Sequence, residues 1–456
     1  MKSLPRSLNL VDVILMTVVS VVSLRWIARG ALAGAPAIGL WIAAALLFFV
    51  PLAIATAKLA RLHPEQGGLY VWVRKAFGPS HGFLCGWCLW VNNLFYFPSI
   101  LLFAAANALA PFGPAYAGLA QDRLYSSAFV LIALWAAVAV NIVGLRFGRW
   151  IQNVGSLGIW VPAGLVIGAG AYALARWGSA TSFAPAALVP RDDTLTVLAL
   201  WSAMCFAFSG MEITSLVSRE VKDAERTIPR GVLIGGALVT IVYLAGTAAV
   251  LVAVPADALH ERSGLADAVS LVGTRAGVGA FGGLTGVMLA VAALTSTLSW
   301  MAGAARVPFA AAEDGTLPRA FSRLHQRWQT PVFALIAQGV ISTGIFLVSA
   351  FLSATGSRTS VQDAYDVLIN LTIMIYFVPY LYVFAALPKL TGGSRLAAAS
   401  GFAATAVSLG LVFVPPAGAD ALNYEIRLCV QAAAIIAIGY ALKWMASRSR
   451  AADVLR

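Results

Sequence analysis

The chain has 456 residues, of which 60% are apolar and only 11% are charged, and its formal net charge is +12 at pH 7. A soluble protein of ordinary composition carries about 25% charged residues, so this composition excludes a soluble protein and predicts an integral membrane protein.

Apolar stretches long enough to cross a bilayer recur along the whole chain. A transmembrane helix needs about 20 mostly apolar residues. We place twelve helices at 9–30, 36–60, 82–110, 124–145, 150–176, 194–218, 231–254, 278–305, 331–352, 364–387, 395–414 and 425–446. The loops between them are too short for a separate soluble domain, so we expect one all-α membrane transport domain over 1–456.

The positive charge is distributed unequally between the two sides of the membrane. Most of the 31 Lys and Arg residues fall on alternate loops, those that share a side with the N-terminus. The positive-inside rule then gives an even number of helices with both termini cytoplasmic. We expect the chain to lie in the inner membrane. The charge is thus a topology signal and does not predict binding to nucleic acid.

Polar residues interrupt the first and the sixth stretch midway, at Ser20–Arg25 and at Ser209–Glu212. The interruptions occupy matching positions in two five-helix halves, 9–176 and 194–387, which two further helices at 395–446 follow. Paired broken helices are typical of secondary transporters built from inverted repeats, with the substrate site at the breaks. The pairs Gly164/Gly168, Gly231/Gly235 and Gly282/Gly286 predict close helix contacts.

Sequence signals for an enzyme, a cofactor or a metal site are lacking. Cys85 and Cys88 lie inside an apolar helix, where packing explains them better than redox or zinc chemistry. No HExxH or GxSxG motif occurs, and no rings of like charge or filter repeats indicate a channel. We therefore expect a carrier that is not an enzyme and has no cofactor.

Three loops carry motifs. The first contains Ala57-Lys58-Leu59, Pro64, Gly67, Gly68 and Tyr70. The second runs through Phe208-Ser209-Gly210-Met211-Glu212, Glu220, Lys222-Asp223 and Ile228-Pro229-Arg230. The third contains Arg306, Ala310, Asp314-Gly315 and Leu317-Pro318. In this order they resemble the amino acid–polyamine–organocation (APC) family of permeases, and the run from Trp72-Val73 to Phe77-Gly78 is most similar to its glutamate/GABA-antiporter branch.

This resemblance implies the leucine-transporter-like 5+5 inverted-repeat fold, with broken helices one and six. It also implies transport of an amino acid or amine by alternating access, in which helices one, two, six and seven rock against three, four, eight and nine. Two departures stand out: Ser23-Leu24-Arg25 replaces a glycine-containing motif, and Lys58 replaces an acidic residue.

Two ionisable residues lie at the breaks. A guanidinium inside a membrane helix usually faces a cavity or a partner, so we expect Arg25 to pair with a substrate carboxylate. The alternatives are that Arg25 reaches the membrane surface or forms an ion pair with Glu212. We expect Glu212 to carry the coupled proton, the alternative being a structural partner for Arg25 or Lys58.

Further candidates surround these two residues. The expected substrate-binding residues are Ser20, Ser23, Leu24, Phe206, Ser209 and Gly210 at the breaks, with Trp90, Asn93 and Trp300 on helices three and eight. A serine in a membrane helix more often bonds its own helix, and each aromatic alone is more often a packing residue. Asn370, Tyr376 and Tyr380 are weaker candidates. The expected inner gate comprises Glu220, Lys222, Arg306 and Asp314, the alternative being solvated loop ends.

The sequence thus predicts secondary active transport of an amino acid, by proton-coupled symport or by amino acid exchange. The alternative is an amine or polyamine carrier of the same fold, although a fixed cation at Arg25 would repel a polycation. Proton and sodium both stay open as coupling ions. The partners are the small substrate and the lipid bilayer, and the chain works as a monomer or a homodimer.

Overall fold

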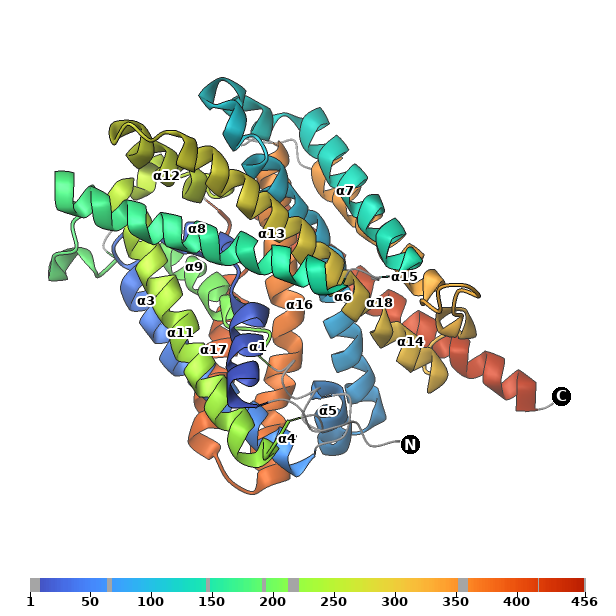
Figure 1. The fold of residues 1–456 in the computed structure, drawn as a ribbon. Coiled ribbons are helices and arrows are strands. Elements are labelled where there is room, and N and C mark those ends of the chain that lie inside the picture. Colours follow the sequence, from blue (N-terminus) through green and yellow to red (C-terminus); the bar gives the residue numbers. More distant parts are fainter. Residues whose placement is uncertain are drawn as a thin grey trace. The chain divides into compact units, whose positions relative to one another are not determined.

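The computed structural model describes residues 9–63, 68–144, 148–190, 194–211, 221–351, 360–416 and 418–454, and the regular elements of this part are helices (Figure 1). The α-helices and one π-helical turn are α1 Leu10–Val21, α2 Arg25–Ala31, α3 Ala37–Ala44, the π-helical turn η1 Ala45–Phe49, α4 Val50–Leu62, α5 Leu69–Phe77, α6 Pro79–Asn107, α7 Arg123–Val143, α8 Gly148–Trp177, α9 Thr194–Ala207, α11 Ala224–Ala253, α12 Gly264–Arg275, α13 Ala280–Ala304, α14 Arg306–Glu313, α15 Val332–Phe351, α16 Ser360–Thr391, α17 Arg395–Leu411 and α18 Ala421–Val454. Short 3-10 helices lie at η2 Ala110–Phe112, η3 Pro114–Gln121, η4 Pro185–Ala187, η6 Ala256–Ala258 and η7 Arg319–Ser322.

The twelve predicted spans all have counterparts in the described residues. Within the described ranges, nine helices are long and apolar enough to cross a membrane, and the bent pair α1 and α2 makes a tenth. Two shorter apolar helices, α9 and α17, correspond to the predicted sixth and eleventh spans. Short helices also follow the second and eighth spans, at α5 and α14, within two of the motif-bearing loops.

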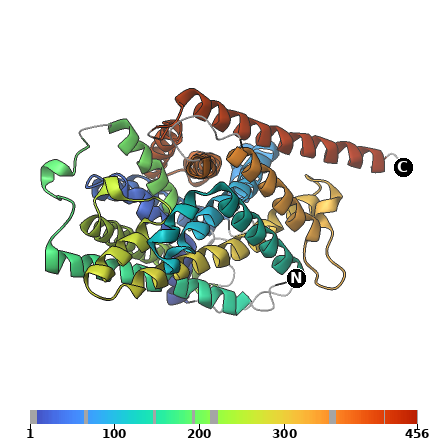
Figure 2. The same cartoon turned by 90° about the horizontal axis from the view of Figure 1, so that it is seen from above.

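The chain packs as two compact units. The first comprises the described parts of Met1–Cys85, Ala163–Phe281 and Phe377–Val414. The second comprises those of Gly86–Pro162, Gly282–Tyr376 and Pro415–Arg456, and it includes the long helix α18 that runs to the C-terminal end in Figure 2. Each unit therefore draws helices from both halves of the sequence.

In the first unit, α1 lies along α11 and α2 packs on α9, α11 and α12 (Figure 1). The predicted close contact at Gly231/Gly235 is present. A Cβ added at Gly231 would lie 2.5 Å from the Val13 side chain, and one at Gly235 would lie 2.8 Å from Thr17. At Gly164 and Gly168, by contrast, an added Cβ would meet no atom within 4 Å, so that predicted contact is wrong in this structure.

Polar pairs join the helices of the second unit. The Arg427 guanidinium of α18 lies 2.7 Å from the Asp363 carboxylate of α16, and the Asn370 amide donates to the Tyr424 hydroxyl at 2.6 Å. Because each of these groups is largely removed from water, pairing offsets its desolvation. These contacts attach α18, one of the two helices beyond the predicted repeats, to α16.

Candidate functional site

The first chain break lies where the sequence predicts it. The helical pattern ends at Val21, Val22 takes an extended conformation, and α2 begins at Arg25 with its axis bent by 57° from that of α1. The run from Thr17 to Val22 is rich in β-branched residues, which lose side-chain freedom in a helix. The last turn of α1 is therefore a favourable place for the helix to stop.

The second break begins where α9 ends, at Ala207. Phe208 to Met211 form a turn, in which Gly210 has a φ of +103° that residues with a Cβ rarely adopt. The Gly210 N–H donates to the Tyr380 hydroxyl at 3.3 Å, and a Cβ added at Gly210 would lie 2.9 Å from the Ser20 carbonyl oxygen. The two breaks therefore pack backbone against backbone within the first unit.

One side chain touches both breaks. The Tyr243 hydroxyl of α11 lies 2.9 Å from the Val21 carbonyl oxygen and 3.1 Å from that of Ala207, and it accepts a hydrogen bond from the Ser23 N–H at 3.2 Å. Sequence reasoning missed this tyrosine because it stands in a mostly apolar stretch of its helix. Its spacing of four residues from Thr247, a second polar residue of that helix, was the available signal.

Arg25 is almost completely buried, with 1% of its surface exposed. Its guanidinium lies 4.3 Å from the centre of the Trp26 ring, a cation–π distance. The Trp26 ring meets Phe206 edge-on at 5.3 Å, and Phe206 lies 6.2 Å from Phe377. This burial is evidence against the alternative in which Arg25 reaches the membrane surface. A buried cation beside an aromatic wall thus adjoins both breaks.

The break serines use their hydroxyl hydrogens locally. The Ser20 hydroxyl donates to the Thr17 carbonyl at 3.1 Å, and the Ser209 hydroxyl donates to that of Phe206 at 2.6 Å. Both follow the alternative in which a serine bonds its own helix. Their oxygens can still accept, so a substrate ammonium or hydroxyl remains a suitable partner. Leu24 is buried at the N-terminal end of α2.

The candidates on helices three and eight belong to the second unit. Trp90 packs against Trp87 with ring centres 5.0 Å apart, and the Asn93 amide donates to the Leu89 carbonyl at 2.9 Å. Trp300 lies 6.3 Å from the ring of Tyr96. Their share in substrate binding stays a prediction.

Three of the four predicted gate residues lie in the described part of the chain. Lys222, Arg306 and Asp314 are exposed, with Arg306 and Asp314 at the two ends of α14. Glu220 and the predicted proton carrier Glu212 lie outside the described residues. The gate and the proton role stay predictions.

A buried ion pair fixes α2 to the connection between α11 and α12. The Arg29 guanidinium bonds the Glu261 carboxylate, and both side chains are at least nine-tenths buried. Sequence reasoning assigned no partner to Arg29. No local pattern joins residues that stand 232 positions apart in the chain.

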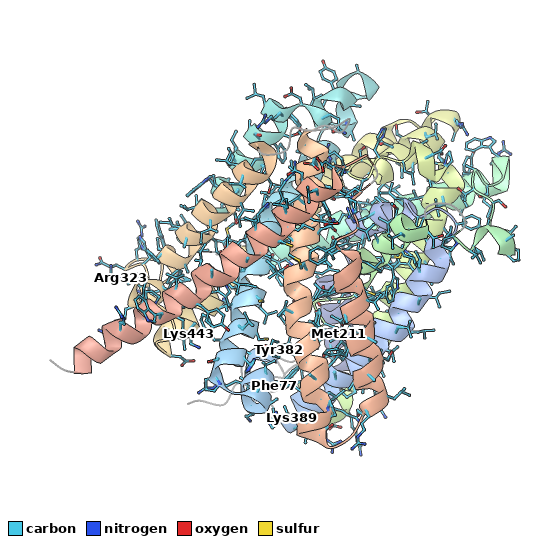
Figure 3. The ribbon with its side chains drawn as sticks, turned by 180° about the vertical axis from the view of Figure 1, so that it is seen from behind. Phe77, Met211, Arg323, Tyr382, Lys389 and Lys443 are labelled. Carbon is cyan, nitrogen blue, oxygen red and sulfur yellow. The ribbon has the colours of Figure 1, made fainter. Side chains whose placement is uncertain are left out.

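A second cluster that sequence reasoning missed joins α5 to α16. Figure 3 labels Phe77, Tyr382 and Lys389, which lie close together. The Lys389 ammonium lies 4.5 Å from the centre of the Phe77 ring, and the His81 ring nitrogen lies 2.8 Å from the Tyr382 hydroxyl. These contacts attach the end of α5 and the start of α6 to α16. Across the described ranges, no group of three His, Cys, Asp or Glu residues is arranged to hold a metal ion.

Comparison with known proteins places this arrangement among transporters. A family model described as amino acid permease matches residues 8–414. An uncharacterized transporter of Legionella pneumophila is 30% identical over 84% of this chain and 81% of its own length. The cadaverine/lysine antiporter of Escherichia coli is 26% identical, covering 88% and 86%, and the glutamate/gamma-aminobutyrate antiporter of Lactococcus lactis is 25% identical, covering 82% and 76%.

Among solved structures, MhsT in complex with L-phenylalanine is similar with a TM-score of 0.59 and 18% identity, covering 91% of this chain and 99% of its own. At this identity the likeness bears on the fold alone. It confirms the leucine-transporter-like fold that the sequence predicted.

Proposed function

The chain belongs to the amino acid permease family, and we propose that it exchanges an amino acid for a related amino acid or amine, with the substrate held at the two chain breaks. Transport follows from the family. Exchange is proposed because two of the three relatives named above are antiporters. We also propose that the chain lies in the inner membrane, with both termini cytoplasmic, the orientation that the Lys and Arg distribution favours.

The observation that carries the proposal is the position of Arg25. It is the first residue of α2, it is buried, and it stands directly at the break. A guanidinium at the centre of a membrane helix costs at least about 2.5 kcal/mol, so it is retained where it has a partner or a task. We propose that its task is to bind the substrate carboxylate.

The ammonium group of the substrate needs a different partner. The aromatic wall of Trp26, Phe206 and Phe377 offers ring faces that attract a cation. The carbonyl ends of α1 and α9 add the negative ends of two helix dipoles. A zwitterion could therefore bind with its carboxylate toward Arg25 and its ammonium toward these groups.

We propose alternating access because the helices of the chain divide into two compact units. The first unit holds α1, α2, α9 and α11, and the second holds α7, α15 and most of α13. These memberships correspond to the two groups of helices expected to rock against each other. Glu212 remains the proposed proton carrier if the exchange is coupled to a proton.

An amine carrier is the second candidate. The name of the cadaverine/lysine antiporter favours it, since cadaverine is a diamine without a carboxylate. The aromatic wall would suit such a cation. Arg25 opposes it, because a buried fixed cation repels a dication in surroundings of low dielectric constant.

Exchange in proteoliposomes tests the proposal. Vesicles loaded with lysine, glutamate, cadaverine, putrescine or agmatine would be offered each radiolabelled compound in turn, for the wild type, Arg25→Ala and Arg25→Lys. Arg275→Ala, an exposed arginine of the same unit, is the matched control. We expect exchange of an amino acid that Arg25→Ala lowers at least about tenfold and that the control leaves unchanged. Exchange of amines alone, unchanged in Arg25→Ala, would reject the carboxylate role and establish the amine carrier.

A further inference from the structure

We propose that Tyr243 is a positioning residue whose hydroxyl holds the two chain breaks in register, in the place where a bound cation could otherwise do so. The three main-chain groups around this hydroxyl come from both breaks: the Val21 carbonyl, the Ser23 N–H and the Ala207 carbonyl. This inference rests on the proposed function only for the position of the substrate at these breaks.

The two carbonyls around the hydroxyl are helix ends. Val21 is the last residue of α1 and Ala207 is the last residue of α9. The final carbonyls of a helix have no partner within that helix, and they carry the negative end of its dipole. Two such ends that converge on one point form the donor set with which broken-helix transporters hold a cation. Here a tyrosine O–H occupies that point.

The hydrogen-bond inventory fits this assignment. A tyrosine hydroxyl has one hydrogen to donate and lone pairs to accept. It accepts from the Ser23 N–H at 3.2 Å and has its single hydrogen to share between carbonyls at 2.9 and 3.1 Å. One hydroxyl therefore bonds three main-chain groups on the two breaks, and removing it would leave all three groups short of one bond.

The ring is held so that the hydroxyl stays at this point. Tyr243 is fully buried, and its ring stacks on Trp41 at 4.5 Å with an interplanar angle of 22°. Phe208 meets it edge-on at 5.7 Å. The Trp41 ring is fixed in turn, because its N–H donates to the Thr247 hydroxyl at 3.0 Å, one turn further along α11. The position is thus set by packing before any substrate binds.

Two consequences follow. The breaks stay joined as one body through α11, so a movement of α1 is transmitted to the end of α9. The junction also needs no sodium ion, because the hydroxyl hydrogen, with its partial positive charge, is the hydrogen-bond donor that the two carbonyls share.

Hydrogen–deuterium exchange on the whole purified protein tests the junction without any substrate. In Tyr243→Phe, which keeps the ring, we expect amide exchange in segments 20–26 and 205–211 to become about tenfold faster, as for the loss of one buried hydrogen bond. Tyr125→Phe is the matched control, because its hydroxyl also donates to a main-chain carbonyl, that of Ala105 at 2.8 Å, in the other unit. It should leave both segments unchanged. Equal exchange in Tyr243→Phe and wild type, with the thermal midpoint retained, would overturn the proposal.

The same experiment tests whether a sodium ion holds the junction. Wild-type exchange in these segments should be the same in sodium chloride and in choline chloride. Protection of segments 20–26 and 205–211 that requires sodium would show that an ion, and not the hydroxyl, makes the junction.

Transport kinetics then separate the junction from the proposed function. With lysine and cadaverine as probes, Tyr243→Phe should raise KM by about tenfold and change the maximal rate less, since the site is loosened before substrate binds. Unchanged KM and maximal rate would contradict a positioning role. If the wild type transports neither these probes nor the others while the exchange result holds, the proposed function fails and the junction stands.

Discussion

The contact between the two breaks predicts a strong effect of one methyl group. In Gly210→Ala, the new Cβ would lie 2.9 Å from the Ser20 carbonyl oxygen, and the φ of +103° would strain any residue with a side chain. The strain costs about 1–3 kcal/mol. Overpacking against a backbone atom costs a further ~1–3 kcal/mol, because a carbonyl in the adjacent break cannot swing away as a side chain does. We expect about 2–6 kcal/mol in total.

Two control variants separate these terms. Gly178→Ala has the same kind of conformation, with φ +81°, but open space around the added Cβ. Gly164→Ala lies within α8, also in open space, and has neither strain nor contact. Gly178→Ala should therefore show only the strain, and Gly164→Ala should be neutral or slightly stabilising, by up to about 1 kcal/mol.

The assay combines the midpoint of thermal unfolding in detergent with the exchange rate in proteoliposomes. Gly210→Ala should lower the exchange rate at least about thirtyfold, the kinetic equivalent of ~2 kcal/mol, whereas both controls should transport at the wild-type rate. A Gly210→Ala protein with the thermal loss of Gly178→Ala and normal transport would refute the reasoning, because it would show that the two breaks do not constrain each other.

Two further predictions concern packing. Gly236→Ala would place a Cβ 1.6 Å from the tip of the Phe49 ring, so it should cost about 1–3 kcal/mol of stability, and Phe49→Leu in the same chain should recover much of the loss; thermal midpoints of the three variants check this. Arg427→Met should cost about 3–5 kcal/mol because it leaves the Asp363 carboxylate without its cation, and limited proteolysis of α18 should become faster. Wild-type midpoints in Gly236→Ala, or unchanged proteolysis in Arg427→Met, would contradict these assignments.

The helices could be predicted from sequence because each span is a long apolar run with charged ends. The predicted helix 124–145 is α7 from Arg123 to Val143, and the first break was expected at the residues where α1 stops. The predicted end of a helix is wrong where the helix continues past its apolar run. The last helix continues to Val454, beyond the predicted 446, because Ala, Ser and Arg residues carry a helix out of the apolar run.

The sequence could not predict which residues contact each other across the fold. The Tyr243 hydroxyl meets residues more than 200 positions away, at Val21 and Ser23, and nothing in the local pattern names them. The pair Arg29 and Glu261 is separated as widely. Glycine spacing alone was also insufficient, since the same motif packs closely on α11 but meets open space on α8. Periodicity specifies which residues face inward, whereas the partner depends on how helices are arranged in space.

The buried pair Arg29 and Glu261 offers a last prediction, on what a charge at this depth contributes. Both side chains are removed from water, so each needs the other to offset its desolvation. Glu261→Gln should leave a buried guanidinium without its charge partner and should cost about 3–5 kcal/mol.

The double variant Arg29→Met with Glu261→Gln removes both charges, and it should regain most of that loss, because a buried ion pair often contributes little compared with apolar or neutral residues of similar size. A thermodynamic cycle over the wild type, both single variants and the double variant measures the coupling. Because both residues lie in the same unit, loss of the ion pair should lower stability and leave the KM for any transported substrate unchanged. A double variant no more stable than Glu261→Gln would mean that the cost arises from lost packing. A change in KM without loss of stability would instead place the pair among the groups that move during transport.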